Sequence, residues 1–203
     1  MRYEIKYALS VVDLGIIKQA IINHPFSFTT AFANRIVNNI YFDTPELNWF
    51  YQNLNGDPNR TKLRYRWYDE EKNIGSGKFE IKLKRNLLGD KKYINQSFSS
   101  YEDLERYMPD QEIFPFLIKP TLKNKYSRSY WISADTKFRI TLDTNLTFEH
   151  TEHSTLLHTE EKIILEIKFA KEDYVFFDEL NKFLPFRQTK FSKYATGISK
   201  LYF

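Results

Sequence analysis

The feature that most constrains the fold is a strict alternation of apolar and charged residues in short segments. In KFEIKLK, residues 78–84, every second residue is apolar and the residues between them are charged. Successive side chains of a β-strand point to opposite faces, so this pattern predicts a strand with one apolar face and one charged face. Such a strand belongs to a sheet that rests one face on a hydrophobic core.

Similar patterns recur along the chain, and they predict that strands dominate the fold. The predicted strands are 2–9, 36–42, 62–68, 77–84, 91–98, 126–132, 137–143 and 162–169. Helical spacing of apolar residues and helix-capping residues predict helices at 11–22, 46–54, 101–108, 172–184 and 192–203. Many strands with a few separate helices indicate an α+β protein with a mainly antiparallel sheet, organised as one domain over residues 1–203.

Composition excludes several classes of protein. The 30 Lys and Arg residues exceed the 26 Asp and Glu residues by only +4, which does not by itself identify a nucleic-acid-binding protein. The chain has no cysteine, which excludes disulfides and thiolate metal sites. The N-terminus carries charges where a secretory signal is apolar, and no apolar run approaches the ~20 residues that span a bilayer. We therefore expect a soluble, cytoplasmic protein.

The charged faces of the predicted strands are rich in cations. These cations are Lys6, Arg64, Arg66, Lys82, Lys84, Arg128, Arg139 and Lys168. Two interpretations stay open: an ordinary sheet with its charges in water, or a closed antiparallel β-barrel of about eight strands with a charged lumen and helices packed outside. In a lumen the cations would repel one another unless a polyanion binds among them. Phosphate chains fit, because Arg binds phosphate oxygens bidentately and Lys supplies a compact charge.

A few acidic residues share these faces, among them Glu4, Glu80, Glu166 and Asp143. They can pair with neighbouring cations, or they can hold Mg²⁺ or Mn²⁺ that bridges to phosphate oxygens. The aromatic residues lie opposite the cations, so a stacking platform for nucleic acid is not expected. Asp43, in IYFDTPE, is interpreted as a turn or capping carboxylate.

Six motifs occur in order across almost the whole chain. They are RYEIKY at 2–7, IYFDT at 40–44, LRYR at 63–66, FEIKLK at 79–84, LEIKF at 165–169 and KFSKY at 190–194. The series resembles the VTC polyphosphate polymerase domain, a branch of the CYTH-like triphosphate tunnel metalloenzymes. The resemblance implies an antiparallel β-tunnel in which basic side chains bind triphosphate or polyphosphate and carboxylates hold a divalent metal.

The resemblance and the charged faces together predict a set of site residues. Lys6, Arg64, Arg66, Lys82, Arg128 and Arg139 are predicted as catalytic tunnel cations. Lys84, Lys92, Lys168, Lys190, Ser192 and Lys193 are predicted to bind substrate. Glu166 is similar to the family's metal-binding glutamate, and Glu4 and Glu80 are further candidates for the same Mn²⁺ or Mg²⁺.

The resemblance predicts a metal-dependent phosphotransferase that moves the terminal phosphoryl group of ATP or another triphosphate to a growing polyphosphate chain. Arg2 stands where tunnel triphosphatases usually carry the first Glu of Glu-x-Glu-x-Lys, and this departure favours a polymerase. Two alternatives stay open: a tunnel triphosphatase, and a polyphosphate- or nucleotide-binding module without catalysis. A separate membrane partner and the oligomeric state are also open.

Overall fold

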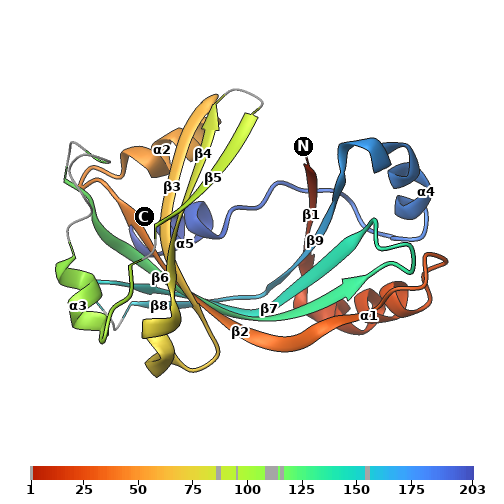
Figure 1. Ribbon diagram of the computed structural model, residues 1–203, viewed down its shortest axis with the longest axis horizontal. Helices are drawn as coiled ribbons and strands as arrows, with labels where there is room; N and C mark the ends of the chain where they lie inside the picture. The colour runs from red at the N-terminus through yellow and green to blue at the C-terminus, as the bar shows by residue number, and fades with distance from the viewer. Residues whose placement is uncertain (1, 86–87, 95, 108–113, 115–116, 154–155) are drawn as a thin grey trace. The chain divides into compact units, whose positions relative to one another are not determined.

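A computed structural model describes residues 2–85, 88–94, 96–107, 114, 117–153 and 156–203 (Figure 1). The strands are β1 (Arg2–Ser10), β2 (Thr29–Asp43), β3 (Asn59–Tyr68), β4 (Lys78–Arg85), β5 (Leu88–Ile94), β6 (Lys119–Ile132), β7 (Arg139–His150), β8 (Leu157–Glu160) and β9 (Lys162–Ala170). The α-helices are α1 (Leu14–Ile22), α2 (Asn48–Asn55), α3 (Tyr101–Arg106), α4 (Phe177–Asn181) and α5 (Lys193–Leu201). Short 3₁₀ helices are η1 (Val11–Asp13), η2 (Glu71–Ser76) and η3 (Lys171–Phe176). No helix within these ranges is long and apolar enough to cross a membrane.

The strands form one nine-stranded sheet with the order β1-β9-β7-β6-β2-β3-β4-β5, and β8 pairs with β7. The registers of β1–β9, β7–β9, β2–β3, β3–β4 and β4–β5 are all antiparallel, which confirms the predicted mainly antiparallel sheet with a few helices. Among the described residues the strand order is a path from β1 to β5 and not a ring, so the predicted closed barrel is not observed there. Alternation assigns each side chain to a face, but it does not say whether the first and last strands pair.

The chain divides into two compact units, each described by itself below. Unit 1 contains residues 1–35, 126–146 and 160–191, and unit 2 contains residues 36–125, 147–159 and 192–203. Strands β2, β6, β7 and β8 contribute residues to both units. The expectation of one domain over 1–203 concerns how the two units combine, and it stays a prediction.

The core of unit 1 forms between the apolar sheet face and the helices of that unit. Buried residues of the strands, such as Tyr7 and Leu165, pack in one cluster with Ile17 and Ile21 of α1 and with Leu180 of α4. Both α1 residues lie four positions apart, which places them on one face of the helix. This packing leaves the opposite, charged face of β1 and β9 uncovered by that core.

His24 joins two parts of the unit 1 core. Its side chain is buried, its Nδ1 accepts a hydrogen bond from the backbone N–H of Phe26 at 3.1 Å, and its Nε2 donates to the carbonyl of Leu180 at 3.0 Å. These two bonds require the neutral ring with the proton on Nε2. Burial lowers the pKa of His24 below its ordinary value.

We expect unit 1 to lose stability as the pH falls below about 6.5. The unfolded chain then protonates His24 while the folded chain resists protonation, so unfolding takes up a proton and acid favours it. Thermal melts of the wild type and of His24→Gln at pH 7.5 and 5.5 test this, with a smaller drop in Tm expected for the variant. The buried His150 of unit 2 also has a lowered pKa, but it is present in both proteins and cancels from the comparison. Equal drops would contradict the prediction.

The core of unit 2 covers the apolar faces of β2, β3 and β4. Leu63, Tyr65, Phe79 and Ile81 pack there with residues of α2 and α3, such as Leu104. The glycine that begins the FEIKLK strand region, Gly77, lies so close to the ring of Tyr65 that any Cβ would overlap it. Glycine at position 77 therefore allows close packing where η2 joins β4.

Asp43 organises the end of β2 and the start of α2. Its Oδ1 accepts from the backbone N–H groups of Thr44 at 2.7 Å and Trp49 at 2.9 Å, and its Oδ2 accepts from that of Phe50 at 2.8 Å. Tyr194 of α5 donates its hydroxyl to the same Oδ2. Asp43 is fully buried, so these four donors replace its contacts with water. The interpretation of Asp43 as a capping carboxylate is confirmed.

Several element boundaries differ from the predicted ones for local reasons. β2 begins at residue 29, seven positions before the predicted start. The prediction omitted residues 29–35 because this part of the strand is largely exposed and its sequence shows no alternation. The predicted helix at 172–184 is the 3₁₀ helix η3 followed by the short α4. The sequence pattern predicts Ser99 as the capping residue of the helix at 101–108, but the N-cap of α3 is Ser100, which accepts from Asp103 N–H. The short strand β8 was not predicted.

Candidate functional site

Glu166 is the centre of the charged face of unit 1. It lies opposite Lys6 of β1 and opposite Thr141 of β7, so the three side chains share one face of the sheet. Its carboxylate contacts Lys168 Nζ at 2.5 Å and Lys6 Nζ at 3.5 Å. Lys6 Nζ also contacts Glu4 at 2.9 Å. Two carboxylates therefore share one ammonium group.

The contacts among Glu166, Lys6 and Lys168 determine the protonation states of Glu166 and Lys6. Burial opposes ionisation of Glu166, but the charges of Lys168 and Lys6 outweigh it and hold the pKa of Glu166 well below its usual range. Burial also disfavours the charged form of Lys6, yet Glu166 and Glu4 raise its pKa above the ordinary value. Glu166 and Lys6 are thus both charged at neutral pH.

The neighbouring positions of this face add two arginines. Arg128 of β6 forms a bidentate pair with the buried Asp143, with Nε–Oδ1 and Nη2–Oδ2 distances of 2.5 and 2.7 Å. Arg139 of β7 is exposed and lies opposite Lys168 in the register. Arg128 is therefore held rigidly, while Arg139 extends the face toward solvent.

The first residues of the KFSKY motif lie beside β1. The backbone N–H of Thr189 donates to the carbonyl of Lys6 at 2.8 Å, and Lys6 Nζ donates to the carbonyl of Phe191 at 3.4 Å. Lys190, between these contacts, is exposed. The structure thus places the backbone on both sides of Lys190 against Lys6, and the role of Lys190 in binding substrate stays a prediction.

The charged face around Glu166 contains oxygen atoms that could bind a divalent metal. Thr141 Oγ1 is buried and has no hydrogen-bond partner within the described ranges, and it lies on the strand position opposite Glu166. The described residues contain no group of three or more His, Cys, Asp or Glu side chains that could hold a metal by themselves. Mg²⁺ is usually bound by one or two carboxylates together with waters and substrate phosphates. Glu166, Glu4 and Thr141 fit a metal of this kind.

Glu80 is the centre of the charged face of unit 2. Its Oε2 accepts from Arg64 Nε at 2.6 Å and lies 3.8 Å from Arg66 Nη1, and its Oε1 contacts Lys91 Nζ at 2.9 Å. Burial opposes ionisation of Glu80, but Arg64, Arg66 and Lys91 lower its pKa to about 2. One buried carboxylate therefore joins three cations from β3 and β5.

The two arginines of this cluster are also held by neutral groups. Arg66 Nε donates to Asn39 Oδ1 at 2.7 Å, and Asn39 donates to Asn124 Oδ1 at 3.3 Å. Both amides are almost fully buried. Arg64 Nη1 donates to the hydroxyl of Tyr41 at 3.4 Å. These contacts position Arg64 and Arg66 independently of Glu80.

The remaining part of the KFSKY motif lies in unit 2. Ser192 is the N-cap of α5 and accepts from Ala195 N–H at 3.3 Å. Its hydroxyl also accepts from Lys62 Nζ at 2.9 Å. Lys193 follows in the first turn of α5 and is partly buried. The structure thus adds Lys62 to the predicted pair of Ser192 and Lys193.

The predicted lysines of β4 and β5 are placed differently from one another. Lys82 is exposed and lies opposite Lys62 and Lys91, on the charged face. Lys84 occupies the next position on that face of β4, and its side chain lies outside the described part of the chain. Lys92 lies opposite Ile81 and therefore on the apolar side. Lys91, not Lys92, contacts Glu80, and only the register of β5 could have identified it.

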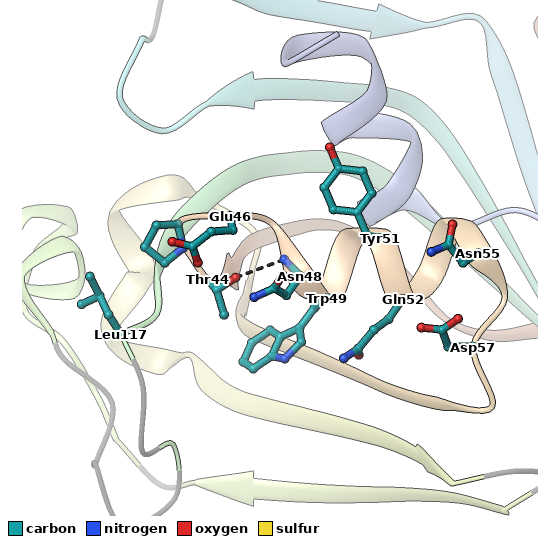
Figure 2. A pocket seen from close by; sticks show the side chains of 10 residues that line it. Thr44, Glu46, Asn48, Trp49, Tyr51, Gln52, Asn55, Asp57 and Leu117 are labelled. Atoms are coloured by element: carbon teal, nitrogen blue, oxygen red, sulfur yellow. Dashed lines mark hydrogen bonds between the residues drawn. The ribbon is translucent and has the colours of Figure 1, made fainter.

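Unit 2 also has a surface pocket whose described lining contains none of these cations. It is lined by α2 and the segments beside it, including Glu46, Trp49, Gln52 and Asp57 (Figure 2). Figure 2 also shows the hydroxyl of Thr44, which accepts from the backbone N–H of Asn48 at the start of α2. Of the described residues, those that line the pocket include acidic and amide groups but no Lys or Arg. This pocket is therefore not a candidate site for phosphate.

Comparisons with known proteins agree with the motifs. A model of the family described as the VTC domain matches residues 1–202. A search of curated protein sequences found no match. A putative adenylyl cyclase from Hippeastrum, whose structure is described as revealing a dominant triphosphatase activity, has a similar fold (TM-score 0.58, 14% identity, 98% of this chain and 96% of that chain covered).

Two further solved structures are similar over almost their full lengths. A putative adenylate cyclase from Vibrio parahaemolyticus matches with a TM-score of 0.55 and 13% identity, covering 98% of this chain and 97% of that chain. A protein from Pyrococcus horikoshii OT3 matches with a TM-score of 0.55 and 15% identity, covering 98% and 96%. At these identities the likeness shows the fold alone.

Proposed function

The chain belongs to the VTC domain family, and from this premise we propose that it is a metal-dependent polyphosphate polymerase. In this proposal its charged faces bind a nucleoside triphosphate, such as ATP, and a polyphosphate chain. The supporting observation is that both units present cations already fixed by carboxylates, such as Arg128 by Asp143 and Arg64 by Glu80. Groups held in place before the substrate arrives lose little freedom on binding it.

The reaction requires positioning and charge neutralisation more than covalent help from the protein. A terminal oxygen of the polyphosphate chain attacks the γ-phosphorus of the triphosphate and forms the new P–O bond. The bond to the β–γ bridging oxygen breaks, and the nucleoside diphosphate leaves with that electron pair. The acceptor oxygen is already anionic, so no protein nucleophile is needed.

In each unit, the cations of the charged face would neutralise the charge of the phosphate groups bound to that face. In unit 1 these are Lys6, Arg128, Arg139, Lys168 and Lys190. In unit 2 these are Arg64, Arg66, Lys82, Lys84, Lys91 and Lys193, and Ser192 would add a neutral hydroxyl donor. Arginine side chains bind phosphate oxygens through two parallel N–H groups, which also fixes their orientation.

Glu166 and Glu4, with the hydroxyl of Thr141, would hold the divalent cation, Mn²⁺ or Mg²⁺. When bound, such a cation neutralises charge on phosphate oxygens and makes the phosphorus more electrophilic. The protein's own part is to keep Glu166 ionised, which the adjacent Lys168 and Lys6 do.

A triphosphatase is the second candidate, favoured by the fold shared with the Hippeastrum protein and its described triphosphatase activity. It would use the same cations with water as the acceptor. Arg2 argues for the polymerase, because an arginine at this exposed position supplies no carboxylate for a second metal. A binding module without turnover is the third candidate.

Incubation with ATP and Mn²⁺ separates the three candidates. A polymerase gives a ladder of polyphosphate chains on a gel, a triphosphatase releases only orthophosphate, and a binding module shows thermal stabilisation by polyphosphate without turnover. Arg64→Met should abolish the ladder of polyphosphate chains, because the charged face of unit 2 loses the arginine that contacts its central residue, Glu80. Lys72→Met is the matched control, since Lys72 forms an exposed pair with Glu70. Release of orthophosphate alone would refute the polymerase.

A further inference from the structure

Glu80 occupies the place at which three cations of unit 2 meet. Both of its oxygens are engaged, Oε2 by the two arginines and Oε1 by Lys91. The contact distances of 2.6 and 2.9 Å to Arg64 Nε and Lys91 Nζ are those of charge-assisted hydrogen bonds. A phosphate oxygen would make the same kind of contacts with the same donors. The carboxylate thus stands where an oxygen of a phosphate group would bind.

The cations are held in position by other groups as well. Arg66 is bound to Asn39, which is itself bound to Asn124, and Arg64 is bound to Tyr41. Release of Glu80 would therefore leave both arginines close to their present positions. This makes an exchange of one anion for another feasible without rebuilding the site.

We propose that Glu80 is a built-in counter-ion which the phosphate chain displaces from Arg64, Arg66 and Lys91. This inference rests on the proposed function, and it gives Glu80 a role different from that of a metal ligand. The carboxylate limits repulsion among the three cations when no substrate is bound. It also weakens the hold on phosphate, because it competes for the same donors, and so it helps the product to leave.

The contacts of Glu80 favour this role over metal binding. A metal ion at its carboxylate would lie within reach of three positive side chains, which would oppose its binding. Glu166 also lies beside cations, Lys168 and Lys6, but Glu4 shares the ammonium group of Lys6 with it. The hydroxyl of Thr141, which has no hydrogen-bond partner within the described ranges, lies on the opposite strand position and adds an oxygen ligand. Two carboxylates of similar surroundings therefore receive different roles.

The test is the binding of inorganic triphosphate to Glu80→Gln, measured by calorimetry in the presence of a metal chelator. Removing the competing charge while keeping the shape of the side chain should tighten binding about tenfold and steepen its dependence on salt. The Mn²⁺ concentration that gives half-maximal activity should not change. Weaker binding, unchanged binding, or a higher Mn²⁺ requirement would each overturn the proposal.

Two further variants make the result specific. Glu149→Gln removes one negative charge from an ion pair with Lys123 in the same unit, at 3.0 Å, and should leave triphosphate affinity as in the wild type. Glu80→Asp keeps the charge on a shorter side chain and should stay within about threefold of the wild type, so a tenfold loss there also contradicts the counter-ion role. If neither the wild type nor Glu80→Gln binds triphosphate, the proposed function fails and this inference fails with it; if the wild type binds triphosphate and Glu80→Gln does not bind it more tightly, this inference alone fails.

Discussion

Replacing Glu166 with glutamine should lower metal-dependent turnover of ATP or inorganic triphosphate about 100-fold. The amide cannot supply the negative charge that a divalent cation requires, and Glu4 and Thr141 would remain as incomplete ligands. Lys6 and Lys168 lose their shared counter-ion and stay positive. Binding of triphosphate without metal should therefore be retained or become tighter. Steady-state rates at varied Mn²⁺, together with calorimetry in a chelator, measure the two effects separately.

Glu172→Gln is the matched control for this variant. Glu172 lies in η3 of the same unit and is exposed, so its loss changes the net charge equally without touching the site. Wild-type turnover in Glu166→Gln would refute the role of Glu166 as a metal ligand. The contrast with Glu80→Gln is the stronger evidence. Glu166→Gln should abolish the dependence of turnover on Mn²⁺, whereas Glu80→Gln should leave that dependence unchanged.

The faces of the strands could be predicted from the sequence because alternation has a direct physical cause. In β4, Phe79 and Ile81 are buried while Lys82 is exposed. Alternation does not determine the register in which two strands pair. The pairing of Lys6 with Glu166 joins β1 to β9 across most of the chain, and it depends on how the apolar faces pack. The central ion pairs of the candidate site therefore required the structure.

Other features were missed because no periodic pattern marks them. Asn39 follows another asparagine, and only its burial and its bond to Arg66 show its role. Lys91 and Lys92 are adjacent, so the sequence cannot say which of them faces Glu80. The sequence also suggested cations that repel one another until an anion binds. In the structure carboxylates such as Glu80 and Asp143 neutralise much of that charge.

The contacts of Asp43 explain how unit 2 positions the KFSKY residues Ser192 and Lys193. Asp43 accepts three backbone N–H groups at the start of α2 and the hydroxyl of Tyr194 in α5. It thereby ties the end of β2 to both helices. Removing the carboxylate would leave these donors buried without an acceptor, and each such group costs about 1–3 kcal/mol.

Asp43→Ala should therefore lower the free energy of unfolding by about 3–5 kcal/mol, the largest loss expected from one substitution in unit 2. Tyr194→Phe removes only one of the four donors and should cost about 1–2 kcal/mol. Because the hydroxyl of Tyr194 needs Asp43 as its acceptor, adding Tyr194→Phe to Asp43→Ala should cost less than Tyr194→Phe alone costs in the wild type. Urea denaturation of the four proteins gives this coupling. Strict additivity, or a midpoint of Asp43→Ala equal to that of the wild type, would show that Asp43 does not hold α2 and α5 together.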